Sequence, residues 1–357
     1  MTDETVAVIT TVRNERNSIQ ALLDAFLMQT RVPDEIVVVD GGSTDGTIDI
    51  LKGYQVKYPI LKLHVEPGVN IARGRNIAIH RSQCSIVAVT DGGCHPELNW
   101  LEELVRPLEA DAGFGAVTGA RRIVGANRFE EFAGLLSTSI NATEERERMF
   151  YGRNSAFRKT VWAQIGGYAE WLYTAEDTLF ALRAKALGCR VALAETSIVS
   201  WRPRPNLRKL CKQYFLYGRG TGRIGNSDLP TVAYHLRNHA LWMAPLALAP
   251  IFPWLLLLTV GVLAFMYSTL VRPVLASVRR RSSRGGTEYW VPLIVMARSF
   301  FNNVGQLLGH WEFRRVAPFM ANHRSYLAGE WQSPELAAAA SAVSSSRVAS
   351  ARLPAQP

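Results

Sequence analysis

The chain has 357 residues, of which 48% are hydrophobic and 20% charged, which allows one large domain with a buried core and a smaller additional region. Its formal net charge of +10 favours an anionic partner, such as a nucleic acid, a membrane surface or a phosphorylated substrate. The spacing of Cys84, Cys94, Cys189 and Cys211 matches neither a zinc site nor a disulfide framework, so we expect reduced thiols. The acidic residues 1–4 lead into an apolar strand, and we expect no signal peptide.

Strands and helices are predicted to alternate in the first part of the chain. Short apolar runs that end in turn-forming residues predict buried strands at residues 6–11, 36–39 and 85–90. The spacing of apolar residues predicts helices between them, at residues 19–29 and 70–82. This alternation predicts an α/β fold with a mostly parallel, Rossmann-like sheet and helices on both of its faces.

Acidic residues follow two of these strands and begin a later helix. Asp40 comes directly after the strand at residues 36–39, where open α/β sheets bind ligands, and it could accept a hydrogen bond from a base or ribose. Asp91 follows the strand at residues 85–90, and its carboxylate could hold a divalent cation on a diphosphate. Asp177 could take a proton from an attacking hydroxyl. Each acid alone could simply form a turn or a cap, but the three together favour a functional site.

The composition changes after Trp201. Arginine and lysine crowd into residues 202–223, interleaved with tyrosine and phenylalanine. Residues 241–271 carry no charge and exceed the roughly 20 apolar residues that span a bilayer. Their prolines favour a helical hairpin that turns near residues 250–253. The basic loop at residues 272–284 is then expected in the cytosol.

Two further segments complete the chain. Residues 290–308 are a weaker apolar segment, expected to be interfacial or spanning, so residues 226–332 are predicted to form a membrane-associated helical region. Residues 333–357 are rich in alanine and serine and are expected to be disordered.

The order and spacing of several motifs resemble family 2 glycosyltransferases of the GT-A fold over about residues 5–225. The motifs are Asp91 and the segments at residues 8–15, 38–47, 75–76, 152–158, 166–168 and 176–177. The resemblance implies a GT-A nucleotide-sugar-binding domain at residues 1–225. It also implies that a sugar is transferred with inversion from a nucleotide-sugar, using Mg²⁺ or Mn²⁺.

The resemblance also implies roles for individual residues. Asp177 would be the catalytic base, and Asp91 would face the metal. Arg75 would act at the nucleoside or at the diphosphate. The nucleoside pocket would be lined by Thr11, Glu15 and Asp40. The floor near the sugar and acceptor would be formed by Gly152, Asn154, Ser155 and Glu176.

Two positions depart from the usual pattern of this family. The metal site usually has two acids one residue apart, whereas this chain reads Asp91-Gly92-Gly93. The cation would then be held by Asp91, the diphosphate and water, or with help from His95. Gly41 also stands where many relatives have a second aspartate.

The segment after the base lacks the Gln-x-x-Arg-Trp motif of processive polysaccharide synthases. The chain is more similar to membrane-attached bacterial transferases that build exopolysaccharide or envelope glycans one sugar at a time. That similarity would place five residues near the diphosphate or near a lipid-linked acceptor. These residues are Trp201, Arg202, Gln213, Arg219 and Arg223. Alternatively, this basic and aromatic stretch is a juxtamembrane helix on anionic lipid.

The sequence therefore predicts an inverting glycosyltransferase at the inner or plasma membrane, with its catalytic domain in the cytoplasm. Its partners would be a nucleotide-sugar donor, a glycan or lipid-linked acceptor, and membrane lipid. One alternative is a transferase that charges a polyprenyl phosphate with a sugar, and another is a catalytically inactive membrane scaffold. No nucleic-acid-binding motif is present, so no nucleic-acid partner is expected.

Overall fold

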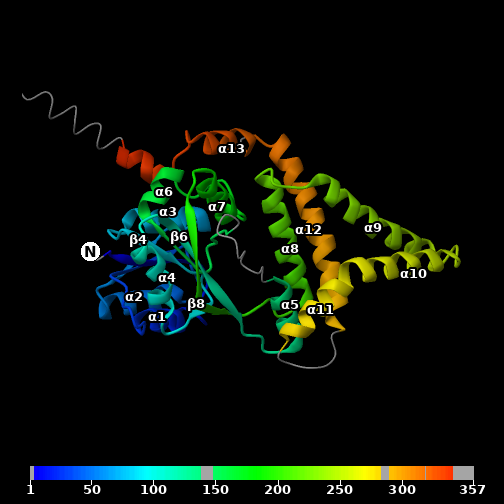
Figure 1. The fold of residues 1–357 in the computed structure, drawn as a ribbon, viewed down its shortest axis with the longest axis horizontal. Helices are drawn as coiled ribbons and strands as arrows, with labels where there is room; N and C mark the ends of the chain where they lie inside the picture. The colour runs from blue at the N-terminus through cyan, green and yellow to red at the C-terminus, as the bar shows by residue number, and fades with distance from the viewer. Residues whose placement is uncertain (1–3, 138–147, 283–288, 318, 341–357) are drawn as a thin grey trace, which may run out of the picture. The chain divides into compact units, whose positions relative to one another are not determined.

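The computed structural model describes residues 4–137, 148–282, 289–317 and 319–340. The chain divides into two compact units, shown with the order of their elements in Figure 1. The first unit comprises residues 1–120, 141–199 and 322–357, and the second comprises residues 121–140 and 200–321.

An eight-stranded sheet has the strand order β3-β2-β1-β4-β7-β6-β8-β5. The strands are β1 (Val6–Val12), β2 (Glu35–Asp40), β3 (Leu61–Val65), β4 (Ile86–Val89), β5 (Cys94–Pro96), β6 (Phe114–Ile123), β7 (Ser155–Arg158) and β8 (Arg190–Trp201). Strands β3, β2, β1 and β4 pair in parallel, whereas β7 pairs antiparallel with both β4 and β6. The sheet is therefore mixed: the four strands β1 to β4 are parallel, as the sequence analysis predicted, and β7 introduces antiparallel pairs on both of its sides.

Helices of the first unit place the polar residues at the strand ends. They are α1 (Ile19–Leu27), α2 (Thr47–Lys57), α3 (Ile71–Arg81), α4 (Trp100–Ala110), α6 (Lys159–Ile165) and α7 (Glu176–Ala186). All residues of β2 are buried, which fits its uniformly apolar sequence. Helix α3 lies very close to β1, since a Cβ atom on Gly74 would stand 2.7 Å from Cγ2 of Thr11. This close approach carries the next residue, Arg75, to the ends of the parallel strands.

The second unit is helical. Its helices are α5 (Arg128–Ser137), α8 (Leu207–Arg223), α9 (Leu229–Leu248), α10 (Leu255–Met266), the π-helical turn η2 (Tyr267–Val271), α11 (Arg272–Arg281) and α12 (Trp290–Arg315). Helices α8 and α12 pack with almost no space between their backbones. A Cβ atom on Gly309 would lie 2.1 Å from the carbonyl oxygen of Arg219, and one on Gly305 would lie 2.2 Å from that of Phe215. Small residues thus permit this helix pair.

This packing yields a testable prediction. Gly309→Ala should destabilise the second unit by about 1–3 kcal/mol, because the new methyl group meets backbone that cannot rotate away. Gly261→Ala in α10 is the matched control, since nothing lies within 4 Å of its added Cβ atom. Unfolding of the purified protein in denaturant measures both. Equal midpoints for the two variants would contradict the close α8–α12 packing.

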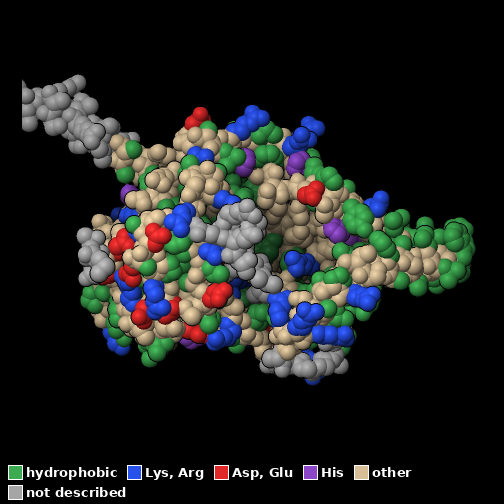
Figure 2. Space-filling model, in the orientation of Figure 1, with side chains coloured by type: hydrophobic (Ala, Val, Ile, Leu, Met, Phe, Trp, Pro, Cys, Tyr) green, Lys and Arg blue, Asp and Glu red, His purple; other side chains and the backbone are tan. Residues whose placement is uncertain are grey.

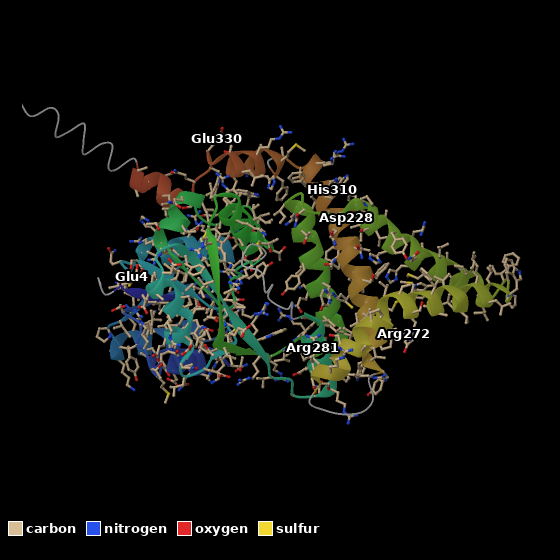
Figure 3. The ribbon with its side chains drawn as sticks, viewed as in Figure 1. Glu4, Asp228, Arg272, Arg281, His310 and Glu330 are labelled. Atoms are coloured by element: carbon tan, nitrogen blue, oxygen red, sulfur yellow. The ribbon has the colours of Figure 1, made fainter. Side chains whose placement is uncertain are left out.

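Helices α9 and α10 form a hairpin with an exposed apolar end. Figure 3 labels Asp228, where α9 begins, and the turn lies at residues 249–254. Ile251, Trp254 and Leu257 are 69%, 65% and 79% exposed, and Figure 2 shows the apolar cover of this end. Among the described residues, one helical stretch, Leu255–Arg281, is long and apolar enough by length and composition to cross a membrane. Helix α12, which contains the predicted weaker segment, is not among such stretches.

The C-terminal segment is ordered further than its sequence suggests. Helix α13 (Phe319–Ala328) is followed by an extended stretch, and residues 334–340 are helical. Ser333 is fully buried. Residues 334–340 are thus helical where the composition predicts disorder, and this helix follows the buried Ser333, whereas residues 337–340 are exposed. Residues 341–357 of that prediction lie outside the described residues.

Candidate active site

The loops after β1 and β2 are tied together by side chains. The backbone N–H of Asn14 donates to Oγ of Ser43 at 2.7 Å, and Oδ1 of Asn14 accepts from the N–H of Thr44 at 2.9 Å. Asn14 has a φ of 57°, in the left-handed region that asparagine tolerates better than most residues. The N–H of Glu15 donates to Oγ1 of Thr47 at 2.9 Å. These bonds fix the shape of the predicted nucleoside pocket.

Asp40 organises the loop that follows it. Its Oδ1 accepts from the N–H groups of Gly42 and Ser43 at 2.9 and 2.7 Å, and its Oδ2 accepts from Oγ of Ser43 at 2.6 Å. Asp40 is fully buried, and Gly42 has a φ of 89° that favours glycine. In this structure both oxygens of Asp40 therefore bond within the loop, and a contact with a base stays a prediction.

Arg75 binds two acids, Asp91 and Glu176, to which the sequence analysis gave separate roles. Its guanidinium is buried and donates to Oδ1 of Asp91 at 2.8 Å and to Oε1 of Glu176 at 2.9 Å. It also lies over the ring of Tyr168, 5.4 Å from the ring centre. A Cβ atom on Gly152 would stand 2.1 Å from Nη2 of Arg75, so glycine is needed there. Burial alone would lower the pKa of Arg75, but the carboxylates of Asp91 and Glu176 hold it above its ordinary value.

The predicted base, Asp177, lies beside this ion network. Oδ2 of Asp177 accepts from the N–H of Gly152 at 3.3 Å, and Oδ1 accepts from the N–H of Thr178 at 2.7 Å. The preceding Ala175 has a φ of 66°, and a strained residue of this kind at the start of a helix is typical of functional turns. Burial and the neighbouring charge of Asp177 raise the pKa of Glu176 to about 7. The two adjacent acids therefore have different environments.

The other predicted floor residues differ in their surroundings. The amide of Asn154 donates to the carbonyl oxygens of Ala120 and Ser197 at 2.6 and 3.0 Å, and it accepts from Nε1 of Trp100 at 2.8 Å. Asn154 is thus buried and holds three segments together. Ser155 is buried in β7. The floor residue Gly152 contacts the predicted base, because its N–H donates to Oδ2 of Asp177.

The basic residues predicted for the diphosphate or acceptor have partners within the second unit. Arg202 makes a bidentate ion pair with the fully buried Glu130, at 2.9 and 2.8 Å. Arg219 and Arg223 both bind Glu312, at 3.0 and 2.6 Å. Burial alone would raise the pKa of Glu312, but these two arginines lower it to about 2. The amide of Gln213 donates to the hydroxyl of Tyr217 at 2.8 Å, and Trp201 is buried. Ligand contacts of these five residues stay predictions.

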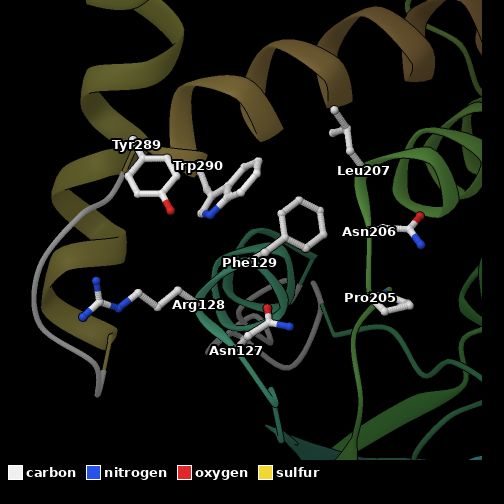
Figure 4. A pocket seen from close by; sticks show the side chains of 8 residues that line it. All are labelled: Asn127, Arg128, Phe129, Pro205, Asn206, Leu207, Tyr289 and Trp290. Carbon is white, nitrogen blue, oxygen red and sulfur yellow. The ribbon is translucent and has the colours of Figure 1, made fainter.

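The second unit also contains an apolar pocket at the start of α8 and α12. Figure 4 shows Phe129, Leu207 and Trp290 around this pocket, whose volume is about 490 Å³. Its remaining lining residues are Asn127, Arg128, Pro205, Asn206 and Tyr289. A second apolar pocket, of about 620 Å³, shares Leu207 with it and has Arg208 and Lys212 in its lining. An apolar surface beside cationic side chains suits an amphiphile that carries negative charge.

Comparison with known proteins identifies the family. The profile described as Glycosyl transferase family 2 matches residues 7–169, and the profile described as Glycosyl transferase family group 2 matches residues 100–279. The chain belongs to glycosyltransferase family 2. It is therefore a transferase, of the inverting GT-A type.

The similar proteins are named as glycosyltransferases or, in one case, as a protein of succinoglycan biosynthesis. The chain is 27% identical to the glycosyltransferase AglE of Haloferax volcanii, over 62% of this chain and 75% of AglE. It is 26% identical to the succinoglycan biosynthesis protein ExoA of Rhizobium meliloti, over 74% of this chain and 84% of ExoA. The structure resembles the mannosyltransferase PcManGT of Pyrobaculum calidifontis with a TM-score of 0.55 and 22% identity, over 85% of this chain and 87% of PcManGT. That likeness shows the GT-A fold.

The residues of this site fit a divalent cation that one acid, Asp91, would hold. Within the described ranges, no three His, Cys, Asp or Glu side chains gather as metal ligands. Asp91 supplies a hard carboxylate that is 29% exposed, and its Oδ2 lies 3.8 Å from Nε of Arg153, too far for a tight ion pair. Glu15 lies alongside, because a Cβ atom on Gly92 would stand 3.2 Å from its Cγ. His95 contacts the carbonyl oxygen of Pro96, and a metal role for it stays a prediction.

The sequence analysis included Asn76 and Arg153 in its motif segments but gave neither residue a role in this site. Asn76 accepts from the N–H of Tyr168 at 2.7 Å and from Nε1 of Trp162 at 3.0 Å, and it donates to Oε1 of Glu170 at 2.9 Å. Arg153 faces Asp91. The polar Arg75-Asn76 pair inside an otherwise apolar helix pattern was the available signal for Asn76, since a buried amide must find partners.

Proposed function

We propose that this glycosyltransferase moves a sugar from a nucleotide-sugar to a hydroxyl of a lipid-linked glycan at a membrane surface, with Asp177 as the base. The observation that carries this proposal is the arrangement around Arg75. Arg75 binds Asp91, the proposed metal ligand, and it lies against Gly152, whose N–H donates to the proposed base Asp177.

The chemistry follows from the groups in the network. Asp177 takes the proton of the acceptor hydroxyl, whose oxygen attacks the anomeric carbon on the face opposite the diphosphate. The hydrogen bonds from Thr178 and Gly152 fix the direction of the carboxylate of Asp177. Arg153 supplies positive charge for the departing diphosphate. A bound Mg²⁺ or Mn²⁺, held by Asp91, would neutralise further charge on that group, and PcManGT has been solved with GDP-Man and Mn²⁺.

A panel of nucleotide-sugars tests the donor class. The purified full-length protein should bind or hydrolyse one of them in a Mn²⁺- or Mg²⁺-dependent manner. Offering that donor with an organic extract of membrane lipids, a water-soluble glycan or a polyprenyl phosphate distinguishes the acceptors. Label transferred into the lipid extract but not onto the bare polyprenyl phosphate is the expected result. Label only on the soluble glycan would contradict a lipid-linked acceptor.

The proposed metal ligand, Asp91, gives a prediction of its own. Asp91→Asn should abolish the gain in donor affinity that Mn²⁺ gives the native protein, because the neutral amide is a poor ligand for a hard cation. The amide oxygen can still accept a hydrogen bond from Arg75, which limits disturbance of the network. Isothermal titration of the donor, with Mn²⁺ and with excess chelator, measures the effect. Native affinity that is unchanged by chelator would show a site that works without metal.

The membrane location is supported by the exposed apolar end of the α9–α10 hairpin and by the two apolar pockets. An α-helix rises about 1.5 Å per residue, so α9, with 20 residues, extends about 30 Å, but its apolar part, residues 241–248, extends only about 12 Å. We therefore propose a hairpin that enters and returns, keeping both of its ends on the cytoplasmic side. The catalytic unit must be on that side because nucleotide-sugars are made there.

Cysteine labelling in intact cells tests this topology. A cysteine introduced at Ser283, which lies outside the described residues, should resist a membrane-impermeant reagent until the cells are permeabilised. The basic side chains of α11, bounded by Arg272 and Arg281 in Figure 3, keep this end in the cytosol. Labelling without permeabilisation would favour a single crossing and exclude the hairpin.

A further inference from the structure

The C-terminal segment packs an aromatic cluster onto the loop that precedes α7. Trp331 lies edge-on to Trp171, with ring centres 4.9 Å apart, and Tyr326 contacts the same Trp171 ring at 5.6 Å. Tyr326 and Trp331 also contact each other at 5.5 Å. Tyr326 is fully buried. Aromatic pairs of this kind contribute about 0.5–1.5 kcal/mol each beyond the area they bury.

Backbone hydrogen bonds fix the same segment in register. The N–H of Ser333 donates to the carbonyl oxygen of Gly166 at 2.8 Å. The hydroxyl of Tyr326 donates to the carbonyl oxygen of Gly167 at 2.9 Å. Gly166 and Gly167 both have a φ of 94°. A Cβ atom on Gly166 would stand 2.4 Å from the carbonyl oxygen of Trp331. Both glycines are therefore shaped to receive the C-terminal segment.

The opposite side of this loop carries the reaction site. Tyr168 lies against Arg75, and its N–H is held by Asn76. The amide of Asn70 donates to the carbonyl oxygens of Glu170 and Leu172 at 2.6 and 3.1 Å. The loop then runs through the strained Ala175 to Asp177. Residues 166–177 are thus held on one side by α3 and on the other by the C-terminal segment.

We propose that residues 326–337 are a positioning strap, which holds the loop at residues 166–177 so that Asp177 stands in place for transfer. The strap touches neither the donor nor the acceptor and acts through the loop. Its effect on transfer rests on the proposed role of Asp177 as the base. A displacement of about 1 Å at a reacting group can cost about 10²-fold in rate, so a loosened loop should lower the rate without weakening donor binding.

Trp331→Ala tests this proposal in the full-length protein. The expected result is a fall in kcat of at least about tenfold, with the KM for the donor within about twofold, and faster hydrogen exchange in residues 166–177. Trp331→Phe should restore most of both properties, since it keeps an aromatic ring against Trp171. The control is Arg324→Ala, which truncates an exposed side chain of α13 outside the strap.

The outcomes separate this proposal from the proposed function. Faster exchange in residues 166–177 with an unchanged kcat would overturn the strap's role in transfer. Unchanged exchange would overturn the strap itself, even if no nucleotide-sugar were ever turned over by the native protein. If Trp331→Ala does not fold, Tyr326→Phe removes only the hydroxyl that binds Gly167, and it should give a smaller change in the same direction.

A carboxyl pair supplies a second readout of strap docking. Glu170 lies near Glu335, accepts a hydrogen bond from the amide of Asn76 at 2.9 Å, and lies 3.7 Å from the guanidinium of Arg73. Burial, together with the charge of Glu335, raises the pKa of Glu170 to about 7. A carboxyl whose folded pKa is raised stabilises docking below about pH 4.5, and this contribution is lost as the pH rises through about 7.

The protection of residues 326–337 against hydrogen exchange, corrected for intrinsic rates, should therefore fall between about pH 5 and 8. Glu335→Gln removes the repelling charge and keeps a donor for Glu170, so its protection should fall less over the same range. An identical fall in both proteins would show that the carboxyl pair has no part in docking.

Discussion

Asp177→Asn is expected to lower the rate of sugar transfer by about 10²–10⁴ while donor affinity changes by no more than a few-fold. The amide has almost the same shape as the carboxylate and can still accept from the N–H groups of Thr178 and Gly152. It cannot take the proton of the acceptor. Steady-state kinetics with a radiolabelled donor, together with a direct binding measurement, separate the two effects.

The control for this variant is Asp49→Asn, which changes an exposed acid in the first turn of α2 without touching the Arg75 network. It should transfer sugar at the native rate. A normal rate for Asp177→Asn would show that another group is the base. A loss of donor binding equal to the loss of rate would show that Asp177 acts in binding and not in proton transfer.

Arg75→Met should both destabilise the first unit and abolish transfer. Methionine keeps the apolar stem but leaves the buried carboxylate of Glu176, and the partly exposed carboxylate of Asp91, without their shared partner. Breaking a buried ion pair in this way typically costs about 3–5 kcal/mol. Transfer should also be lost because Asp177 and Gly152 are held against the same network.

Thermal unfolding followed by circular dichroism measures the first effect. Arg106→Met is the matched control, because Arg106 is 59% exposed and pairs with Glu103 at the surface, where such pairs contribute about 0–1 kcal/mol. Equal melting temperatures for the two variants would mean that the buried network contributes nothing to stability. Native transfer by Arg75→Met would remove the network from the reaction.

Sequence patterns were sufficient to predict where the strands end, but not to predict the ion pairs between side chains near those ends. Short apolar runs identified β1, β2 and β4, so the positions of Asp40 and Asp91 followed. The ion pairs of Arg75 depend on how α3 and α7 meet after folding, and no local spacing encodes that meeting. The same limit applies to Arg202, whose partner Glu130 is far away in the sequence.

The C-terminal strap shows a different limit. The sequence analysis assigned Tyr326 and Trp331 to a membrane-associated helical region. It expected disorder only from residue 333, because alanine and serine predominate there. What orders this segment is its hydrogen bonding to the carbonyl oxygens of Gly166 and Gly167, which lie more than 150 residues earlier in the chain.

The configuration of the product tests the central claim most directly. The donor found in the nucleotide-sugar panel is incubated with the full-length protein and its acceptor, and the anomeric coupling constants of donor and product are compared by NMR. One displacement assisted by Asp177 predicts a product whose anomeric configuration is opposite to that of the donor, and predicts that Asp177→Asn forms almost none of it. A product with the configuration of the donor would contradict a single displacement and the proposed role of Asp177.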